Sequence, residues 1–287
     1  MAEAIRKTAI IGAGMMGAEI ALCSALSGCE VVLKDVSMEL AQQGKERLKK
    51  TLESQIKKGR ISLEAVELER CLNSISPTDS YDSLKDADLV IEAVVEKTNI
   101  KREVFRQLDS VCKPECILVS NTSSLSITDL ASITRRPDKF IGMHFFSPAT
   151  VMKLVEVIPG LDTSELTTEV AMTVARSMGK EPILVKECAG FVVNRLLVAM
   201  LAEGIRIVEE GIASPEDVDK AMRLGCGHPV GPFQLMDLIG LDLNLEILQI
   251  FHDAYGERFH PPLLIKRKVG AGHLGRKAKR GWYDYRS

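Results

Sequence analysis

Short apolar runs and longer amphipathic stretches alternate along the first two thirds of the chain. Each apolar run is a few residues long and has no polar side, which is typical of a strand buried on both faces of a sheet. The stretches between these runs have helical spacing. We expect strands at residues 8–11, 31–33, 89–95, 117–120, 140–146, 153–158 and 182–185, and helices at residues 37–58, 99–111 and 163–178. This alternation predicts an α/β fold, with a doubly wound, mostly parallel sheet covered by helices on both faces.

The pattern changes after residue 186, where the sequence predicts helices and no strands. Residues 191–208 are apolar nearly all round, so this helix is expected to be buried within its domain or at a subunit interface. Ser214 and Pro215 stand in the order of an N-cap and a first helical residue. Another helix is expected at residues 235–250. The expected domains are residues 1–186 and an all-helical second domain, residues 187–287.

A glycine motif follows the first predicted strand. Gly12, Gly14 and Gly17 have G-x-G-x-x-G spacing, with a helix after them and a second strand after that helix. The first glycine allows a tight turn, the second lets a pyrophosphate approach the backbone, and the third lets helix and strand pack closely. Asp35 ends the second strand, close to the roughly 20 residues expected before a ribose-binding acid. These features predict a Rossmann-like, dinucleotide-binding domain.

The acid also bears on the choice of cofactor. A carboxylate at Asp35 accepts hydrogen bonds from the ribose hydroxyls of NAD and repels the 2′-phosphate of NADP. The neighbouring Lys34 leaves some tolerance of NADP open. Met15 and Met16 lie in the turn itself and complete its expected contacts with the cofactor.

Polar side chains gather where the predicted strands end. Asp35, Glu96 and residues 121–124 all follow strands, and ligands bind at the carboxyl ends of parallel strands. Glu92 interrupts its apolar strand and is a candidate to line the cleft. We expect these separate segments to meet in one functional cleft.

His144 is a candidate general base. It ends a predicted strand, and the Ser147-Pro148 turn lets residues 153–158 return antiparallel, so that Glu156 comes within reach of its ring. A buried carboxylate needs such a partner. Beside a nicotinamide, this histidine would take the proton from an alcohol while the cofactor takes the hydride, and the glutamate would fix its tautomer.

Other interpretations of these side chains stay open. A histidine on an apolar strand is often a core residue. Ser123 and Asn194 are candidates to hold the substrate oxygen, but a helix cap and a packing hydrogen bond explain them equally well. Serine-hydrolase chemistry is disfavoured because the sequence has no G-x-S-x-G motif.

The predicted helix at residues 37–58 has two contrasting sides. Leu40, Leu48 and Leu52 form an apolar side, and lysines load the other. These lysines are Lys45, Lys49, Lys50, Lys57 and Lys58. They form either a solvated face or a patch for an anionic ligand.

Composition narrows the class of protein. The chain has 287 residues and a net charge of −2, so nothing in its overall charge favours nucleic acid. Its longest apolar run is far too short to span a membrane. We expect no targeting segment, and a cytoplasmic protein. The seven cysteines are scattered and odd in number, and Cys112 and Cys116 lack the partners of a zinc site, so we expect free thiols and no metal.

With these residues assembled, the whole chain resembles the short-chain L-3-hydroxyacyl-CoA dehydrogenases, including those of the 3-hydroxybutyryl-CoA type. The runs that carry the resemblance are IGAGMMGAEIA, NTSSLSIT, HFFSPATVMKLVEVI, GFVVNRLL and GHPVGPFQLMDLIGLD. The resemblance implies that His144 is the catalytic base, with Glu156 as its partner, and that Ser123 and Asn194 contact the substrate. It implies a cofactor site that includes Asp35, Glu96, Lys101, Asn121, Ser123, Ser147 and Lys277. It also implies Thr51 and Lys58 as contacts of CoA, and a homodimer formed through the helical domain.

Two positions depart from the family pattern. Ser147 stands where the family usually has asparagine, close to the nicotinamide. Lys279 stands where the family tail has glycine, in GRKAKRGWYDY, although Lys277 still matches.

The resemblance implies an NAD-dependent oxidoreductase that interconverts (S)-3-hydroxyacyl-CoA, with 3-hydroxybutyryl-CoA as the expected substrate, and 3-oxoacyl-CoA. Acyl-chain length and direction, butyrate-type synthesis or fatty-acid oxidation, stay open. Two alternatives are a dehydrogenase of a free hydroxy acid or sugar acid, such as gulonate, and a structural or NAD-sensing protein that kept the fold.

Overall fold

The computed structural model describes residues 5–59 and 65–286, and for residues 65 and 66 only the backbone. The chain divides into two compact units, Met1–Cys188 and Ala189–Ser287. The expectation of an α/β domain followed by a helical domain is confirmed.

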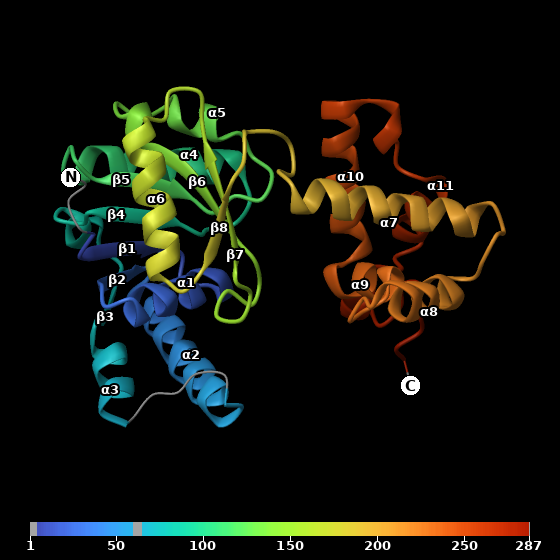
Figure 1. Ribbon diagram of the computed structural model, residues 1–287, viewed down its shortest axis with the longest axis horizontal. Coiled ribbons are helices and arrows are strands. Elements are labelled where there is room, and N and C mark those ends of the chain that lie inside the picture. The colour runs from blue at the N-terminus through green and yellow to red at the C-terminus, as the bar shows by residue number, and fades with distance from the viewer. Residues whose placement is uncertain (1–4, 60–64, 287) are drawn as a thin grey trace. The chain divides into compact units, whose positions relative to one another are not determined.

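The first unit is built on one sheet of the described residues (Figure 1). In spatial order its strands are β3 (Ile75–Thr78), β2 (Glu30–Lys34), β1 (Lys7–Ile11), β4 (Leu89–Glu92), β5 (Ile117–Ser120), β6 (Phe140–Phe145), β7 (Leu154–Pro159) and β8 (Glu181–Leu184). Strands β3 to β6 are parallel, β7 runs antiparallel to β6, and β8 is parallel to β7. The carboxyl ends of β1, β2, β4, β5 and β6 therefore lie at one edge of the sheet.

Helices cover the sheet because the strands are apolar on both faces. Ile10, Leu33, Ile91 and Val119, each from a different strand, are all fully buried. The helices of this unit are α1 (Met15–Leu26), α2 (Met38–Lys57), α3 (Ala65–Asn73), α4 (Thr98–Val111), α5 (Ile127–Ala131) and α6 (Glu165–Ser177), with 3₁₀ turns η1 (Tyr81–Leu84) and η2 (Pro137–Lys139). Figure 1 shows α6 lying across one face of the sheet, over β6 to β8.

The structure corrects several local expectations. The strand expected at residues 89–95 ends at Glu92, and Val95 is 59% exposed in the loop that follows. Within α2, Leu48 and Leu52 are buried as expected, but Leu40 is 40% exposed. Helix α3 and edge strand β3 had no expectation at all. The short sequence ISPT of β3 contains a proline, which edge strands tolerate but which weakens the strand pattern.

The second unit consists of helices: α7 (Val193–Glu209), α8 (Pro215–Cys226), α9 (Pro232–Ile239), α10 (Leu241–Tyr255) and α11 (Leu263–Gly270), with 3₁₀ turns η3 (Glu257–Phe259) and η4 (Arg276–Ala278). As expected, Ser214 caps α8 by accepting from the Asp217 amide, and Pro215 follows it. The helix expected at residues 235–250 is divided at Gly240, whose φ of 108° favours glycine.

The apolar helix α7 is buried on one side only. Leu201 and Ile205 pack into the core of this unit, whereas Leu196 is 69% exposed in the single chain. Burial of this helix within its own domain is therefore only partial, and its burial at a subunit interface stays a prediction.

The C-terminal tail is fixed by a buried carboxylate. Asp237 accepts hydrogen bonds from the amides of Trp282 and Tyr283 and from the hydroxyl of Tyr285. Tyr283 in turn donates its hydroxyl to Asp219. Within this tail Lys279 takes a left-handed backbone conformation, with φ of 54°, at the position where glycine was expected.

No helix among residues 5–59 and 65–286 has the length and the apolar composition needed to cross a membrane.

Candidate active site

The three motif glycines have different surroundings. A Cβ on Gly12 would lie 2.7 Å from the Ala93 carbonyl oxygen, and a Cβ on Gly17 would lie 1.8 Å from the Gly12 carbonyl oxygen. Both positions therefore need glycine for the chain to pack against itself. A Cβ on Gly14 would meet nothing within 4 Å. The backbone of Gly14 thus faces open space just before the N-terminus of α1, where helix N–H groups favour a phosphate.

Asp35 holds this turn from the end of β2. Its carboxylate accepts a hydrogen bond of 2.7 Å from the Ala13 amide, and another from the Val36 amide. Arg47 of α2 donates to the Ala13 carbonyl oxygen at 2.7 Å. A Cβ on Gly44 would lie 2.6 Å from that of Ala13, so α2 is as close to the turn as its backbone allows.

The side chain of Lys34, which precedes Asp35, is directed toward Tyr81. Its side chain is buried, and its ammonium lies 4.0 Å above the ring of Tyr81 and donates to the Asp35 carbonyl oxygen. Burial lowers the pKa of this lysine, although the charges of Asp35 and Asp79 oppose the effect.

Two glutamates and a lysine form a buried network at the ends of β4 and β5. Lys101 of α4 places its ammonium 2.6 Å from Glu92 and 3.1 Å from Glu96. The side chains of Lys101 and Glu92 are 1% and 0% exposed. Ser120 donates its hydroxyl to the other carboxylate oxygen of Glu92 at 2.7 Å. Glu92 was expected to line a cleft, but it is the inner counter-ion of Lys101.

Glu96 connects this network to the loop after β5. It accepts hydrogen bonds from the Thr122 hydroxyl, from the Ser123 amide at 2.9 Å, and from the hydroxyls of Ser123 and Ser124 at 3.3 Å. Burial raises the pKa of Glu96, but the charge of Lys101 and these hydrogen bonds outweigh it, so its pKa lies below the usual value. Glu96 is therefore an ionised acceptor that orients Ser123.

His144 and Glu156 meet as the antiparallel return predicted. They are directly opposite each other in the β6–β7 register, with Nδ1 of His144 2.8 Å from a carboxylate oxygen of Glu156. Both side chains are buried, and the ring of Phe146 packs 4.4 Å from the histidine ring. Such an arrangement fixes the orientation of the imidazole, as in catalytic sites where a histidine held by a carboxylate acts as a general base.

Two more contacts join the segments around His144. Asn121 accepts from the Phe145 amide at 2.9 Å, which ties the end of β5 to the histidine strand. Ser147 lies 3.9 Å from the sulfur of Met15, which brings the turn after β6 to the glycine motif. Met16 is half-buried beside the core of the same unit.

The remaining candidates lie elsewhere. Thr51 and Lys58 are on and after the C-terminal half of α2, which projects beyond the sheet (Figure 1), and Lys58 is exposed. Asn194 is half-buried in the first turn of α7 in the second unit. Lys277 is also in the second unit, where it forms an ion pair of 2.6 Å with Asp242.

Comparison with known proteins places the chain in a family. Residues 7–188 match the family described as "3-hydroxyacyl-CoA dehydrogenase, NAD binding domain", and residues 190–285 match "3-hydroxyacyl-CoA dehydrogenase, C-terminal domain". The chain belongs to the 3-hydroxyacyl-CoA dehydrogenase family.

Individual members of this family are similar over nearly their whole length. The probable 3-hydroxybutyryl-CoA dehydrogenase of Bacillus subtilis is 45% identical over 98% of this chain and 98% of its own. The 3-hydroxybutyryl-CoA dehydrogenase of Clostridioides difficile is 46% identical over 97% of this chain and 99% of its own. The crystal structure of the (S)-3-hydroxybutyryl-CoA dehydrogenase of Ralstonia eutropha superimposes with a TM-score of 0.95, at 43% identity, over 99% of this chain and all of its own.

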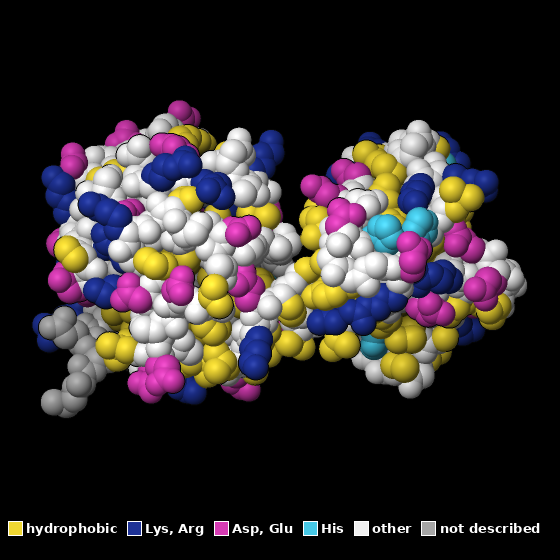
Figure 2. Space-filling view, turned by 90° about the horizontal axis from the view of Figure 1, so that it is seen from above, with side chains coloured by type: hydrophobic (Ala, Val, Ile, Leu, Met, Phe, Trp, Pro, Cys, Tyr) yellow, Lys and Arg dark blue, Asp and Glu magenta, His cyan; other side chains and the backbone are white. Residues whose placement is uncertain are grey.

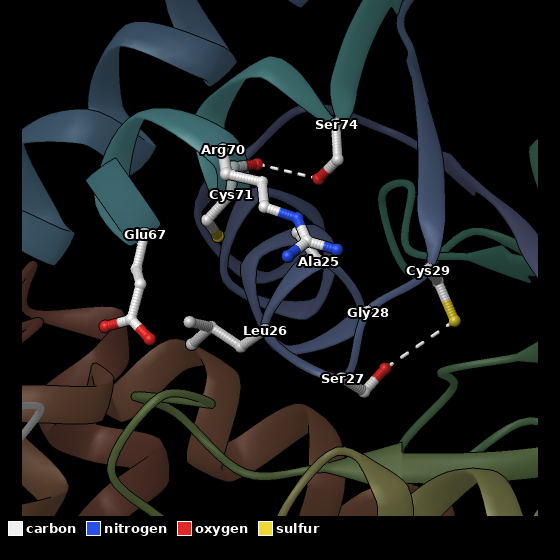
Figure 3. Close-up of a pocket in the computed structure, with 9 residues that line it drawn as sticks. All are labelled: Ala25, Leu26, Ser27, Gly28, Cys29, Glu67, Arg70, Cys71 and Ser74. Carbon is white, nitrogen blue, oxygen red and sulfur yellow. Dashed lines mark hydrogen bonds between the residues drawn. The ribbon is translucent and has the colours of Figure 1, made fainter. Parts of the chain in front are cut away.

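A hollow at the opposite edge of the sheet is distinct from this site. It has a volume of about 310 Å³ and lies between the end of α1, the start of β2 and α3 (Figure 3). Figure 3 shows Arg70 over it and Glu67 at its side. Cys29 precedes β2 whereas Asp35 follows it, so this hollow is at the amino ends of the strands, opposite the edge where such sheets bind ligands.

Gly44 and Arg47 adjoin the glycine turn, although their pattern in the sequence does not single them out. The available signal was a glycine inside a strongly amphipathic helix, which indicates a close approach. Only the fold shows that the approached element is the glycine turn.

Proposed function

We propose that the protein is an NAD-dependent dehydrogenase that interconverts (S)-3-hydroxyacyl-CoA, 3-hydroxybutyryl-CoA in particular, and 3-oxoacyl-CoA. The observation that carries the proposal is the 2.8 Å contact between His144 and Glu156, in the same unit as the open backbone at Gly14. The names of the similar proteins supply the substrate class.

The buried histidine performs the proton transfer. Glu156 accepts the Nδ1 proton of His144, which leaves Nε2 as the acceptor for the proton of the 3-hydroxyl group. When bound, NAD supplies the acceptor for the hydride that leaves C3. Glu156 then balances the charge of the imidazolium, and the reverse reaction returns the proton to the ketone oxygen. General acid–base catalysis of this kind contributes about 10²–10⁴ to the rate.

The residues of the turn support NAD as the cofactor, in preference to NADP. Asp35 places a carboxylate beside the glycine turn, where it would repel a 2′-phosphate. Lys34 is buried against Tyr81, so its ammonium is not exposed to bind a 2′-phosphate. Gly12, Gly14 and Gly17 with Met15 and Met16 form the pyrophosphate side. Glu96, Lys101, Asn121, Ser123 and Ser147 form the nicotinamide side, with Lys101 acting through Glu96.

The substrate contacts rest on family resemblance. Ser123 and Asn194 hold the 3-oxygen, and Thr51 and Lys58 contact CoA. Lys277 is a proposed contact of the cofactor, and we propose a homodimer formed through the second unit. The exposed Leu196 supports such an interface, since an exposed apolar side of a helix favours a partner. The cytoplasm is the proposed compartment, and the buried thiols of Cys23, Cys29, Cys71, Cys112 and Cys116 are consistent with it.

The first measurement is oxidation of NADH with acetoacetyl-CoA, run beside NADPH and beside free acetoacetate. We expect fast turnover only when NADH and acetoacetyl-CoA are both present, and not with NADPH or with free acetoacetate. Turnover with free acetoacetate but not with the ester would retain the dehydrogenase mechanism and reject the CoA assignment. No turnover with either acetoacetyl-CoA or free acetoacetate, in a folded protein that binds NADH, would favour a structural or NAD-sensing role.

A further inference from the structure

Three side chains of the second unit form a cluster that the proposed function does not use. His252, Glu257 and His260 each offer one ligand atom, and these atoms all lie within 4.8 Å of one another. Figure 2 shows histidine and acidic side chains side by side on the surface of this unit. We propose that this cluster binds one divalent transition-metal ion of the Zn²⁺ type.

The fold brings the three residues together through a tight reversal. His252 lies in the last turn of α10, and Gly256 ends that helix with a φ of 77°. Turn η3 then carries Glu257, and His260 follows it. Phe259 is buried and packs 5.2 Å from Phe251. Because these buried neighbours anchor both sides of the reversal, the backbone that carries the two histidines is held in place before any ion binds.

The distances are within about 0.1 Å of those around a tetrahedral ion. Nε2 of His252 is 3.2 Å from one carboxylate oxygen of Glu257, and Nδ1 of His260 is 3.7 Å from the other. Ligands at 2.0–2.2 Å from Zn²⁺ in a tetrahedron are separated by about 3.3–3.6 Å. The two imidazole rings are perpendicular, with centroids 5.1 Å apart, so small side-chain rotations would direct both nitrogens at one ion.

The ligand set also selects the kind of ion. Two imidazoles and one carboxylate suit Zn²⁺, Ni²⁺, Co²⁺ or Cu²⁺, whereas Mg²⁺ and Ca²⁺ prefer oxygen ligands. Glu257 and His260 are exposed, which leaves a fourth position for water. Asp253 lies 3.9 Å from Nδ1 of His252, on the side where a second carboxylate would support a metal-bound ring.

One neighbour opposes binding. The ammonium of Lys266 is 3.4 Å from Nε2 of His260, where it donates to the ring in the absence of an ion. With a metal ion on Nδ1 of His260, Nε2 would carry a proton, and Lys266 would have to move away from it. Replacing Lys266 by methionine should therefore tighten metal binding, by about fivefold.

The test is a titration with Co²⁺ of the tag-free protein in which Cys226→Ser removes the exposed thiol. We expect one site per chain, with d–d absorption and no sulfur-to-cobalt band, displaced by Zn²⁺ and not by Mg²⁺. His252→Ala and His260→Ala should each weaken binding at least tenfold. His228→Ala and His273→Ala, in the same unit but outside the cluster, are the matched controls and should leave it unchanged.

Two further measurements fix the outcome. Saturating Zn²⁺ should raise the unfolding midpoint by about 5 °C, because the ion binds only the folded reversal, and His252→Ala should abolish the shift. Far-UV circular dichroism of each variant establishes that it is folded. Equal Co²⁺ affinity in the wild type and in the His252→Ala/His260→Ala double variant would overturn the proposal, as would several equivalent weak sites.

Discussion

The buried ion pair between Glu92 and Lys101 gives the sharpest prediction about the first unit. Lys101→Met removes the counter-ion of a carboxylate that has no solvent exposure. Removing one partner of a buried pair costs about 3–5 kcal/mol, because the other charge stays buried or must take up a proton. For a unit of this size that corresponds to a midpoint lowered by about 6–20 °C.

A surface pair on the same helix is the control. Arg106 and Glu103 of α4 are 3.3 Å apart, and both are more than half exposed. Arg106→Met should cost less than about 1 kcal/mol. Urea and thermal unfolding, followed by circular dichroism, would measure both variants.

The double variant Glu92→Gln/Lys101→Met separates pairing from simple loss of packing. It removes both charges together, so it should be more stable than Lys101→Met alone by about 2 kcal/mol or more. The interpretation of this network would be wrong if Lys101→Met lowered the free energy of unfolding no more than Arg106→Met does. It would also be wrong if the double variant lost more free energy of unfolding than the sum of the losses in Glu92→Gln and Lys101→Met.

Four more predictions follow from particular contacts. Glu156→Gln should lower turnover by about 10²–10⁴ with NAD affinity within about twofold of the wild type, measured by steady-state kinetics and NADH titration; unchanged turnover would exclude the dyad. Gly14→Ala should keep the unfolding midpoint, because its Cβ would meet no protein atom, but should weaken NAD binding, because that Cβ would occupy the space proposed for the pyrophosphate. Gly17→Ala should destabilise the turn itself, and thermal unfolding beside NADH titration distinguishes the two variants. Burial opposes ionisation of Asp109, but hydrogen bonds and charge from Arg135 and Arg136 hold its pKa below the usual value. The stability that Asp109 contributes is therefore present above the unfolded pKa of 3.8 and is lost as pH falls through the lower folded pKa. The free energy of unfolding of Asp109→Asn should decrease less steeply on acidification than that of the wild type, and an equal slope would contradict this. Lys279→Gly should raise the free energy of unfolding by roughly 0.5–1 kcal/mol, because a left-handed residue other than glycine costs about 1–2 kcal/mol and glycine returns part of that in chain entropy; a destabilised variant would show that Lys279 is held by other contacts.

Local sequence patterns predicted the parts of the site that are close in the chain. The glycine turn and Asp35 lie within one strand–helix–strand unit, so spacing alone located them. The opposition of His144 and Glu156 was also predictable, because a turn between two short strands sets their register.

Contacts between distant segments were not predictable in the same way. Glu92 looked like a residue lining a cleft, and the resemblance placed Lys101 in the cofactor site, because the sequence does not reveal that α4 places one against the other. The same holds for Arg47, whose partner is the Ala13 carbonyl oxygen, and for Gly240, whose backbone conformation divides what reads as one helix.

Three acids of the candidate site share one arrangement. Asp35 accepts from the Ala13 amide, Glu96 from the Ser123 amide, and Glu156 lies against the His144 ring. Each carboxylate therefore holds a neighbouring group of the site in place, in addition to supplying charge. Replacement by alanine would remove charge and positioning together, whereas Asp→Asn and Glu→Gln retain most of the shape and change the charge. Only the amide variants can show which of the two the proposed chemistry depends on.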